Sequence, residues 1–424
     1  MSRIYDLIAL YCPTGVPYKT LGELGKFFGG LTGKKKDDFS DGNEKFITYK
    51  NVYSNPALQV DVEDRVKILS GEKQRTLKYG DIIFTGSSET PDECGISSVV
   101  TAKTDEKLYL NSFCFFFRFD DRNIILPDFA KHLFRSSNLR YQISKTASGV
   151  TRFNVSKKLM EKVKIPVPPR EVQREIVHVL DSFTLLTAEL TAELTARKKQ
   201  YEFYRNKLLT FGNDTLECRL KDICDIFLGL TATPNYTDAG VKFISAQNTS
   251  NDFLDLSNVK YISETDFEST TSNAKPQRGD LLFTRVGSNL GHPVIVETDE
   301  KLCIFVSLGY LRVRNKKQVV IGYLKHWMNT DLFWSQVRKN VHGAAKVNLN
   351  TGWLKEFRIS LPPLETQERI VHVLDNFEAI CTDLNIGLPA EIEARQKQYE
   401  YYRDLLLTFA ETGSMLMTDR TESN

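Results

Sequence analysis

Apolar and aromatic residues recur at alternating steps of four and three along residues 171–211. The recurring positions are Ile176, Leu180, Phe183, Leu190, Leu194, Tyr201, Tyr204 and Leu208, with Thr187 and Arg197 in the gaps. Such spacing is typical of the heptad seam of a coiled coil. It predicts one long helix over residues 171–211, roughly 60 Å long at ~1.5 Å per residue. Pro168 and Pro169 come just before it, where a helix tolerates proline.

A second seam of the same kind lies near the end of the chain. Its positions are Ile370, Leu374, Phe377, Cys381, Leu384, Leu388, Ile392, Arg395, Tyr399, Tyr402 and Leu406. The step from Leu384 to Leu388 to Ile392 inserts an extra four residues, a stutter that locally unwinds a coiled coil. Gly387 and Pro389 lie at the same place, so we expect the helix to break there. Helices with matching seams are expected to pack on each other, and antiparallel pairing would relate the two halves by a pseudo-twofold axis.

Both seams belong to a long internal repeat. Residues 176–181 read Ile-Val-His-Val-Leu-Asp, and residues 370–375, 194 positions later, read the same. Residues 199–202, Lys-Gln-Tyr-Glu, recur at 397–400. A period of this length indicates a duplicated architecture and not a solenoid, whose repeats are shorter. Two equivalent halves suit a ligand with two related sites at a fixed separation.

The two stretches outside the seams alternate short β-type runs with glycine-rich turns. The clearest runs cover residues 112–119 and 301–313, and helical patterns cover residues 127–144 and 320–339. A frame recurs faintly: Gly-Asp-Ile-Ile-Phe-Thr at residues 80–85 returns as Gly-Asp-Leu-Leu-Phe-Thr at 279–284. Between the frame motifs the two stretches share little. The same scaffold with different surfaces suggests two recognition domains for two different targets.

Composition narrows the class of protein. The chain of 424 residues is long enough for two to four domains, and no apolar run approaches the ~20 residues that span a bilayer. Asp6 interrupts the short apolar stretch at the N-terminus, which is not typical of a secretory signal. The seven cysteines lack Cys-x-x-Cys spacing, which favours reduced thiols in a cytoplasmic protein and no metal site. A net charge of +2 means that DNA binding would need clustered basic residues or charge from a partner.

A repeated element precedes each long helix. Residues 165–169, Ile-Pro-Val-Pro-Pro, lead to Gln173, and residues 359–363, Ile-Ser-Leu-Pro-Pro, lead to Gln367. Ahead of each element, glycine is followed by a basic residue and asparagine: Gly149, Arg152 and Asn154 in the first half, Gly343, Lys346 and Asn348 in the second. Together with the order of variable domain and helix, occurring twice over about residues 15–410, this resembles the specificity subunit of type I restriction-modification systems.

The resemblance implies that sequence recognition, methylation and cleavage are carried out by different subunits. Each variable domain would be a target-recognition domain that reads one half of a bipartite sequence in double-stranded DNA. Two modification subunits, carrying S-adenosylmethionine, would methylate adenine, and restriction (motor-nuclease) subunits using ATP and Mg²⁺ would complete a bacterial defence enzyme. This chain would bind no cofactor and have no catalytic site. Consistently, it contains no Asn-Pro-Pro-Tyr/Phe methylation motif and no P-loop.

The predicted fold class is α+β, with two mixed α/β target-recognition domains separated by two long antiparallel coiled-coil helical segments in a pseudo-twofold internal repeat. The predicted divisions are the following: 1–165, first recognition domain; 166–212, central helical spacer; 213–360, second recognition domain; 361–411, distal helical spacer; 412–424, flexible tail.

A tandem repeat inside the first helix adds a hypothesis. Residues 187–190 read Thr-Ala-Glu-Leu, residues 191–194 repeat them, and residues 195–197 begin a third copy. Each unit lengthens a helix by ~6 Å and rotates its end by a net ~40°, and a base pair advances ~3.4 Å and turns ~36°. We hypothesise that the unit count sets the distance between two half-sites. The alternative is that these strong helix formers only extend the helix.

DNA reading needs polar and basic side chains on a stiff scaffold. The candidates for DNA contact are Lys34, Lys35, Lys36, Lys50, Asn51, Ser87, Ser88, Arg152 and Asn154 in the first half, and Gln247, Asn248, Arg285, Ser288, Asn289, Lys346 and Asn348 in the second. Arg152 and Lys346 recur after a glycine turn, which favours holding phosphate over reading sequence. The lysine run is as well explained by a solvated loop, and Asn154 and Asn348 by helix N-caps or turns.

The repeated helices supply candidates for partner binding, namely Gln173, His178, Gln367 and His372. The glutamines alternatively satisfy backbone groups at the helix starts, and the histidines are packed or partner-facing but not catalytic. Tyr201, Tyr204, Tyr399 and Tyr402 lie at seam positions, where helix packing explains them better than stacking on DNA. Two other functions fit the same features: a coiled-coil interaction scaffold, or an accessory DNA-binding protein outside restriction.

Overall fold

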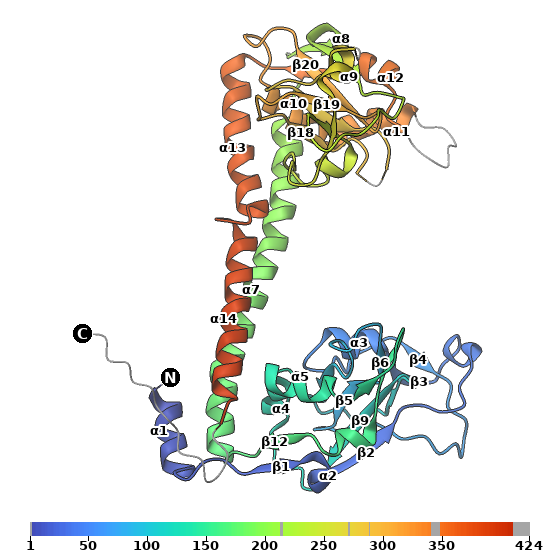
Figure 1. The fold of residues 1–424 in the computed structure, drawn as a ribbon, viewed down its shortest axis with the longest axis vertical. Helices are drawn as coiled ribbons and strands as arrows, with labels where there is room; N and C mark the ends of the chain where they lie inside the picture. Colours follow the sequence, from blue (N-terminus) through green and yellow to red (C-terminus); the bar gives the residue numbers. More distant parts are fainter. Residues whose placement is uncertain (1, 213–214, 270–271, 288, 341–347, 410–424) are drawn as a thin grey trace. The chain divides into compact units, whose positions relative to one another are not determined.

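The computed structural model describes residues 2–212, 215–269, 272–287, 289–340 and 348–409. They form two compact units, one within Met1–Ala188 and Glu393–Asn424 and the other within Glu189–Ile392. Figure 1 draws both units. Among the described residues, no helix combines the length and apolar character that crossing a membrane requires. The predicted tail, residues 412–424, lies outside the described residues.

Short helices and strands make up the recognition part of the first unit. They are α1 (Ser2–Tyr11), β1 (Tyr18–Thr20), α2 (Leu21–Leu24), β2 (Gly25–Gly29), η1 (Lys36–Phe39), β3 (Glu44–Ile47), α3 (Tyr49–Ser54), β4 (Arg65–Val66), β5 (Ile82–Thr85), β6 (Ser87–Ser88), β7 (Ser97–Val99), β8 (Leu108–Leu110), β9 (Cys114–Phe119), α4 (Pro127–Leu133), α5 (Ser137–Ser144), β10 (Ala147–Ser148), β11 (Phe153–Val155), α6 (Lys157–Met160) and β12 (Lys164–Pro166).

The central sheet of the first unit has the strand order β2-β9-β5-β7 and is antiparallel throughout. Strand β9, Cys-Phe-Phe-Phe-Arg-Phe, lacks strict alternation because both of its faces are covered. Phe115 and Phe117 pack into one core cluster with Phe84, and Phe116 packs into another on the opposite face. Helices α4 and α5 lie beside this sheet in Figure 1, and α4 contacts β7.

The second unit repeats this arrangement. Its recognition part contains β13 (Leu216–Arg219), α8 (Leu220–Ile223), β14 (Cys224–Leu228), β15 (Val241–Ile244), η2 (Ala246–Thr249), β16 (Lys260–Ile262), α9 (Glu264–Ser269), η3 (Ser272–Ala274), β17 (Leu281–Thr284), β18 (Pro293–Ile295), β19 (Leu302–Ile304), β20 (Leu308–Val313), α10 (Ile321–Met328), α11 (Asp331–Asn340), α12 (Thr351–Glu356) and β21 (Arg358–Leu361). Its central sheet has the order β14-β20-β17-β18, the counterpart of β2-β9-β5-β7.

The recurring sequence frame corresponds to the same contacts in both units. Arg118 on β9 donates to both carboxylate oxygens of Asp81, at 2.7 and 2.6 Å. Arg312 on β20 does the same to Asp280, at 2.9 and 2.7 Å. Each bidentate pair ties the residue before an inner strand to the neighbouring strand. The faint sequence match therefore marks a structural framework and not a ligand site.

Three expected elements are each split in two. The β-type run at residues 301–313 is two strands, β19 and β20, because the chain turns between them. The expected helices at 127–144 and 320–339 are the pairs α4–α5 and α10–α11. The hydroxyl of Ser136 donates to Leu133 O at 2.7 Å, and that of Thr330 donates to Trp327 O at 2.6 Å. These bonds satisfy carbonyls at the ends of α4 and α10, where the chain leaves the helix.

The long helical segments have the bounds α7 (Arg170–Leu208), α13 (Leu364–Thr382) and α14 (Leu388–Leu406). The predicted break at Gly387 and Pro389 is confirmed, because α13 ends before Gly387 and α14 begins just after it. The first part of α7 and the end of α14 belong to the first unit, and the remainder of both helices belongs to the second, with α13. At the seam, Ile176, Leu180 and Tyr399 are buried in the first unit, and Tyr201, Ile370 and Leu374 in the second.

Candidate nucleic-acid interface

Gln173 joins the start of α7 to the recognition part of the first unit. Its side chain is fully buried. The amide oxygen accepts a hydrogen bond from Leu126 N at 2.8 Å, and the amide nitrogen donates to Ile124 O and Pro168 O at 2.9 and 2.8 Å. All three partners are backbone groups that would otherwise be buried without a hydrogen bond. The glutamine four residues after the proline pair is thus a clamp between the helix and the domain.

Gln367 repeats the clamp in the second unit. Its oxygen accepts from Val320 N at 3.0 Å, and its nitrogen donates to Gln318 O and Pro362 O, both at 2.9 Å. Gln367, too, has no exposed surface. Both glutamines therefore form hydrogen bonds to backbone groups at the helix starts, which is the alternative to partner binding. Neither has exposed surface on which a partner could dock. His178 and His372, by contrast, are exposed on their helices.

Each unit also contains a buried histidine that the sequence patterns did not single out. In the first unit, His132 on α4 lies with Nε2 2.7 Å from Asp181 Oδ1 and with Nδ1 2.9 Å from the hydroxyl of Tyr399. A carboxylate only accepts, so Nε2 carries the proton and a neutral ring accepts at Nδ1 from the tyrosine. Burial lowers the pKa of His132, which favours this neutral form.

The second unit has a similar arrangement, except that the Tyr201 hydroxyl also lies 3.3 Å from Glu378 Oε1 and can donate to only one of its two partners. His326 on α10 lies with Nε2 2.8 Å from Asp375 Oδ1 and Nδ1 3.2 Å from the hydroxyl of Tyr201. The signal that could have found both is a Lys-His pair in each helix, at 131–132 and 325–326, together with the repeated aspartate and tyrosine. Tyr201 and Tyr399 are buried, as their seam positions predicted.

In the described part of the chain, one group of side chains has the composition of a metal site: His326, Asp375 and Glu378. Their ligand atoms already interact with neighbours, because Nε2 of His326 contacts Asp375 and Nζ of Lys325 forms an ion pair with Glu378. The carboxylates are therefore balanced by protein groups in this arrangement.

Four of the predicted DNA contacts in the first unit line one cavity of about 630 Å³, namely Lys50, Ser87, Ser88 and Arg152. The remaining walls are aromatic, hydroxyl and acidic side chains: Tyr49, Tyr53, Glu89, Glu93, Phe113 and Thr151. Phe113 is 57% exposed, and the Arg152 guanidinium lies over its ring, 5.7 Å from the centroid. Sequence patterns missed Phe113 and Glu93 because they lie far along the chain from the basic residues.

Arg152, which lines this cavity, is held in place by a neighbouring hydroxyl. Its Nε and Nη2 atoms lie 3.2 and 3.0 Å from Ser87 Oγ. Asn154 follows on β11, where it pairs with Ser87 of β6, so it is a strand residue and not an N-cap. The N-cap of α6 is Ser156. Gly149 has a φ of 152°, and a Cβ there would lie 2.0 Å from Arg152 O, so the predicted glycine turn is required.

The other predicted positions of the first unit lie away from the cavity or inside the fold. Nζ of Lys34 is 2.6 Å from Glu72, with 8% of its side chain exposed, so it forms an internal ion pair. Lys35 and Lys36 are exposed at the start of η1. Asn51 is buried, and its amide bonds to Gln59 N, Gln59 O and Asn55. Its role is to hold the chain around α3, because these bonds use the groups that would read a base.

Asn248 is the counterpart of Asn51 and has the same internal role. It is buried, accepts from Ser245 N, and donates to Asp255 O and Asn258 O. Arg285 is also buried, and its guanidinium donates to Val306 O at 3.0 Å and Leu349 O at 3.4 Å. Burial lowers the pKa of Arg285. The prediction that these residues contact DNA does not fit their positions, since their polar atoms are used inside the fold.

Gln247, next to Asn248, is exposed and lines a cavity of about 480 Å³ in the second unit. The other walls include Tyr236, Ala246, Lys260, Phe305 and Ser307. The Lys260 ammonium lies over the Tyr236 ring, 4.1 Å from its centroid. Like the first cavity, this one combines a polar side chain that can form hydrogen bonds with bases, a cationic side chain and an exposed aromatic ring.

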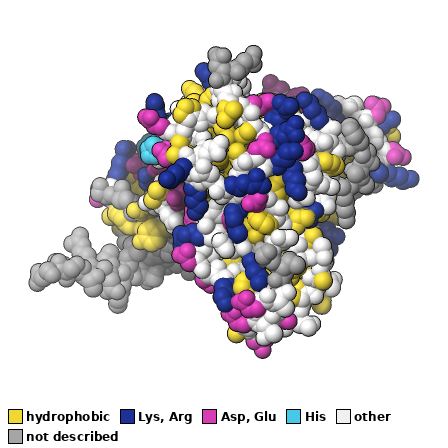
Figure 2. Space-filling model, turned by 90° about the horizontal axis from the view of Figure 1, so that it is seen from above, with side chains coloured by type: hydrophobic (Ala, Val, Ile, Leu, Met, Phe, Trp, Pro, Cys, Tyr) yellow, Lys and Arg dark blue, Asp and Glu magenta, His cyan; other side chains and the backbone are white. Residues whose placement is uncertain are grey.

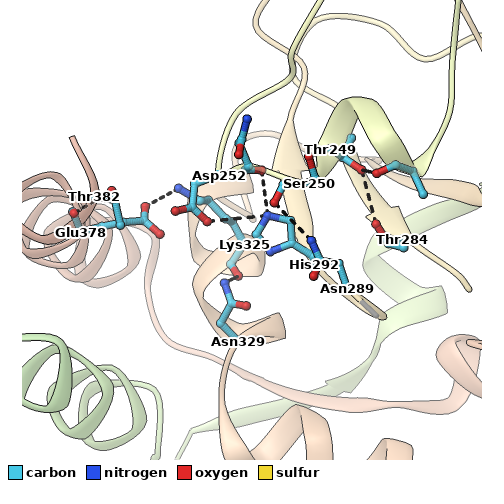
Figure 3. Close-up of polar contacts among 12 residues, drawn as sticks. Thr249, Ser250, Asp252, Thr284, Asn289, His292, Lys325, Asn329, Glu378 and Thr382 are labelled. Carbon is cyan, nitrogen blue, oxygen red and sulfur yellow. Dashed lines mark hydrogen bonds and ion pairs between the residues drawn. The ribbon is translucent and has the colours of Figure 1, made fainter. Parts of the chain in front are cut away.

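The remaining second-unit candidates lie elsewhere. Nδ2 of Asn289 donates to Ser250 O at 3.2 Å, and His292 beside it contacts Asn251 O at 2.9 Å (Figure 3). Asn348 is exposed and pairs with Val286, and the N-cap of α12 is Asn350, so Asn348 is not an N-cap either. Ser288, Lys346 and Gly343 lie outside the described residues. The face drawn in Figure 2 carries lysine and arginine groups with acidic side chains among them.

Comparisons with known proteins match this duplicated organisation. The family model of the type I restriction modification DNA specificity domain matches residues 13–197 and again 213–394. The specificity subunit of the Escherichia coli type I restriction enzyme EcoR124I/EcoR124II is 32% identical over 60% of this chain and 65% of its own length, so the match spans just under two thirds of that relative. The putative Mycoplasma pneumoniae specificity subunit S.MpnORF365P is 31% identical over 61% of this chain and 91% of its own length.

Two solved structures share the fold. A chain from a study of complex assembly and conformational transition of the type I R-M system has a TM-score of 0.65 at 18% identity, covering 93% of this chain and 98% of that one. The HsdS subunit from Thermoanaerobacter tengcongensis has a TM-score of 0.52 at 18% identity, covering 93% and 97%. A scaffold outside restriction is not favoured by these matches, and a specificity subunit has no catalytic site of its own. The chain belongs to the family of type I restriction-modification DNA specificity proteins.

Proposed function

We propose that this chain chooses the DNA sequence on which partner subunits act. Residues 1–165 and 213–360 are the two target-recognition domains, and each reads one half of a bipartite site in double-stranded DNA. The helical segments at 166–212 and 361–411 set the spacer between the half-sites and dock two modification subunits. Methylation and cleavage are then the work of those subunits and of restriction subunits.

The observation that carries this proposal is that one framework presents two different surfaces. The sheet order and the Asp-Arg pairs recur in both units. The cavities of the two units differ in chemistry, with Lys50 and Arg152 in one and Gln247 and Lys260 in the other. A duplicated reader of one identical target would keep the same side chains at these positions. Different linings on one scaffold are expected of a protein that reads two unlike sequences.

Contacts between helices support an antiparallel coiled coil. In the second unit, Phe377 on α13 lies against Tyr204 on α7, with ring centroids 6.0 Å apart. One residue later on α13, Glu378 accepts a hydrogen bond from Tyr201, three residues earlier on α7. In the first unit, Phe183 stacks on Tyr402 at 5.3 Å. With the internal repeat, antiparallel helices of this kind would relate the halves by a pseudo-twofold axis.

The tandem Thr-Ala-Glu-Leu units lie within α7, and an unbroken helix is the element that a spacer ruler requires. A rigid helix transmits both length and rotation, whereas a flexible linker would allow a range of spacers. The exposed His178 and His372 remain candidates for docking modification subunits.

The partners would supply what this chain lacks. S-adenosylmethionine would bind to the modification subunits, and ATP and Mg²⁺ to the restriction subunits, in a cytoplasmic complex. The chain's net charge of +2 is low for an isolated DNA-binding protein, so partner subunits would also provide phosphate contacts around the duplex.

The test is to map N6-methyladenine in DNA from cells that express this chain with its modification subunit. The proposal expects methylation at a two-part sequence with a gap of constant length, absent when this chain is omitted. Methylation at an undivided sequence, or independent of this chain, would contradict the proposal. Co-purification of the chain with the modification subunit provides the second check.

A further inference from the structure

The cavities at Lys50 and Gln247 occupy the same place in the two frameworks. Strand β3 ends with Phe-Ile at residues 46–47, and Lys50 follows three residues after Ile47. Strand β15 ends with Phe-Ile at residues 243–244, and Gln247 follows at the same spacing. On the opposite wall, Gly86 N donates to Phe113 O at 2.7 Å, and Arg285 N donates to Ser307 O at 2.8 Å. These backbone bonds join corresponding strand ends, so Phe113 and Ser307 are counterparts.

Three counterpart positions therefore line both cavities, while their side chains differ. Tyr49, Lys50 and Phe113 in the first unit correspond to Ala246, Gln247 and Ser307 in the second. Asn51 and Asn248, one residue further on, are identical and buried in the fold. At Tyr49/Ala246, Lys50/Gln247 and Phe113/Ser307 the side chain that lines the cavity differs between the units, as expected of positions that determine what is bound.

The first cavity contains a fixed hydrogen-bond acceptor, the carboxylate of Glu93. The carboxylate of Glu93 accepts hydrogen bonds from Tyr53, Ser88 and Thr90, at 2.9, 3.0 and 3.1 Å. Those hydroxyls lower the pKa of Glu93, which keeps it ionised. A fixed carboxylate can accept a hydrogen bond from an exocyclic amine, such as that of cytosine in the major groove.

Lys50 is the group free to donate in the same cavity. It is exposed at the start of α3 and, among the described contacts, takes part in no ion pair. Arg152 is instead held by Ser87 and lies over Phe113. A lysine and a carboxylate that line one cavity match the two edges of a G·C pair, because guanine presents acceptors and cytosine a donor.

Gln247 replaces the lysine in the second cavity. A carboxamide offers both a donor and an acceptor, which matches the N7 and N6 groups of adenine. We propose that these counterpart cavities are the base-reading sites: Lys50 and Glu93 read a G·C pair in one half-site, and Gln247 reads an adenine in the other. This inference rests on the proposed function and adds to it which side chains read and which bases they take.

The experiment is a reciprocal exchange in the full complex, with N6-methyladenine mapping as the readout. Lys50→Gln is expected to lower the preference for guanine at one position of one half-site by about 5- to 150-fold, the range of one good base contact. Gln247→Lys is expected to change one position of the other half-site. Glu93→Gln is expected to relax the same position as Lys50→Gln, because an amide tolerates either donors or acceptors.

Lys19→Gln is the matched control, since Lys19 is exposed on β1 and lines neither cavity. It is expected to leave the motif unchanged. An unchanged motif for Lys50→Gln and Gln247→Lys, with the complex intact, would overturn the inference while leaving the proposed function standing. Changes from both variants in the same half-site would also overturn it. If wild-type complex yields no bipartite motif, the proposed function fails first, and the two failures are thereby distinguished.

Discussion

Nδ1 of His132 lies 2.9 Å from the hydroxyl of Tyr399, a residue 267 positions further along the chain. The contact joins α4, next to the sheet of the first unit, to α14, and Asp181 on α7 holds the other side of the ring. One imidazole therefore bonds to both helices that pack against its domain. In the second unit the buried His326 likewise contacts Tyr201 and Asp375, which indicates that a buried histidine between two helices helps to orient each domain on its own helices.

Replacement of Tyr399 by phenylalanine tests the strength of this triad. The variant leaves Nδ1 of a buried histidine without its donor, which is expected to lower the free energy of unfolding by about 1–3 kcal/mol. Tyr401→Phe is the matched control, because Tyr401 lies on the same helix with 64% of its surface exposed. Denaturant unfolding compares the two. Equal stability of both variants would show that the Tyr399 hydroxyl contributes nothing.

Stability is expected to fall in mild acid because of His132. Burial lowers the pKa of its imidazole below the ordinary value of about 6.5, so the unfolded chain binds the proton more readily than the folded one. The contribution of His132 to the free energy of unfolding is therefore complete above pH ~6.5. It is lost as the pH falls towards the pKa of His132 in the folded protein. His132→Gln should flatten this part of the unfolding profile, and the exposed His178→Gln should not. A profile that keeps its slope in His132→Gln would contradict the assignment.

The Gln173 clamp is expected to be structural. Gln173→Ala leaves one buried N–H and two buried carbonyls without partners and should cost at least about 2 kcal/mol of unfolding free energy. Gln396→Ala is the control, since Gln396 is exposed and bonds only to Glu400 one turn away among the described contacts. A Gln173→Ala chain of normal stability that no longer co-purifies with modification subunits would favour a docking role instead.

Arg152 is expected to hold a phosphate. Its guanidinium is exposed at the end of a glycine turn and is kept in place by Ser87 and Phe113. Arg152→Gln should weaken binding to all sequences alike and reduce the slope of log K against log salt by ~1. Lys158→Gln, an exposed cation on α6, serves as the control. A change of methylation motif in Arg152→Gln would instead assign the residue to base reading.

Deletion of residues 191–194 tests the ruler. Removal of one Thr-Ala-Glu-Leu unit shortens the helix by ~6 Å and turns its end by a net ~40°. The preferred spacer is expected to shorten by about one base pair, with both half-sites unchanged. Selection of methylated sites from a library of spacer lengths measures this. An unchanged spacer length would contradict the ruler hypothesis and would indicate that these units only extend the helix.

Local patterns predicted much of the helical organisation. Heptad spacing predicts the long helices because it depends on residues three and four positions apart, and the break at Gly387 follows from a stutter and a proline in the same place. The two split helices were missed because the hydroxyls of Ser136 and Thr330 satisfy helix ends that apolar periodicity alone does not reveal.

The sequence by itself determined the duplication, the seams and the glycine turn before Arg152, since repeats and turn chemistry are local properties. Only the tertiary structure decided which polar residues remain available. Asn51 and Lys50 are neighbours in sequence, yet the Asn51 amide forms hydrogen bonds to the backbone of Gln59. Lys50 instead lines a cavity together with Glu93 and Phe113. The bond between His132 and Tyr399 likewise depends on helices brought together over hundreds of residues. Contacts between residues that are far apart in the sequence determine the burial and the hydrogen-bond partners of a polar side chain. Burial and partners in turn decide whether that side chain stabilises the fold or is available to a ligand.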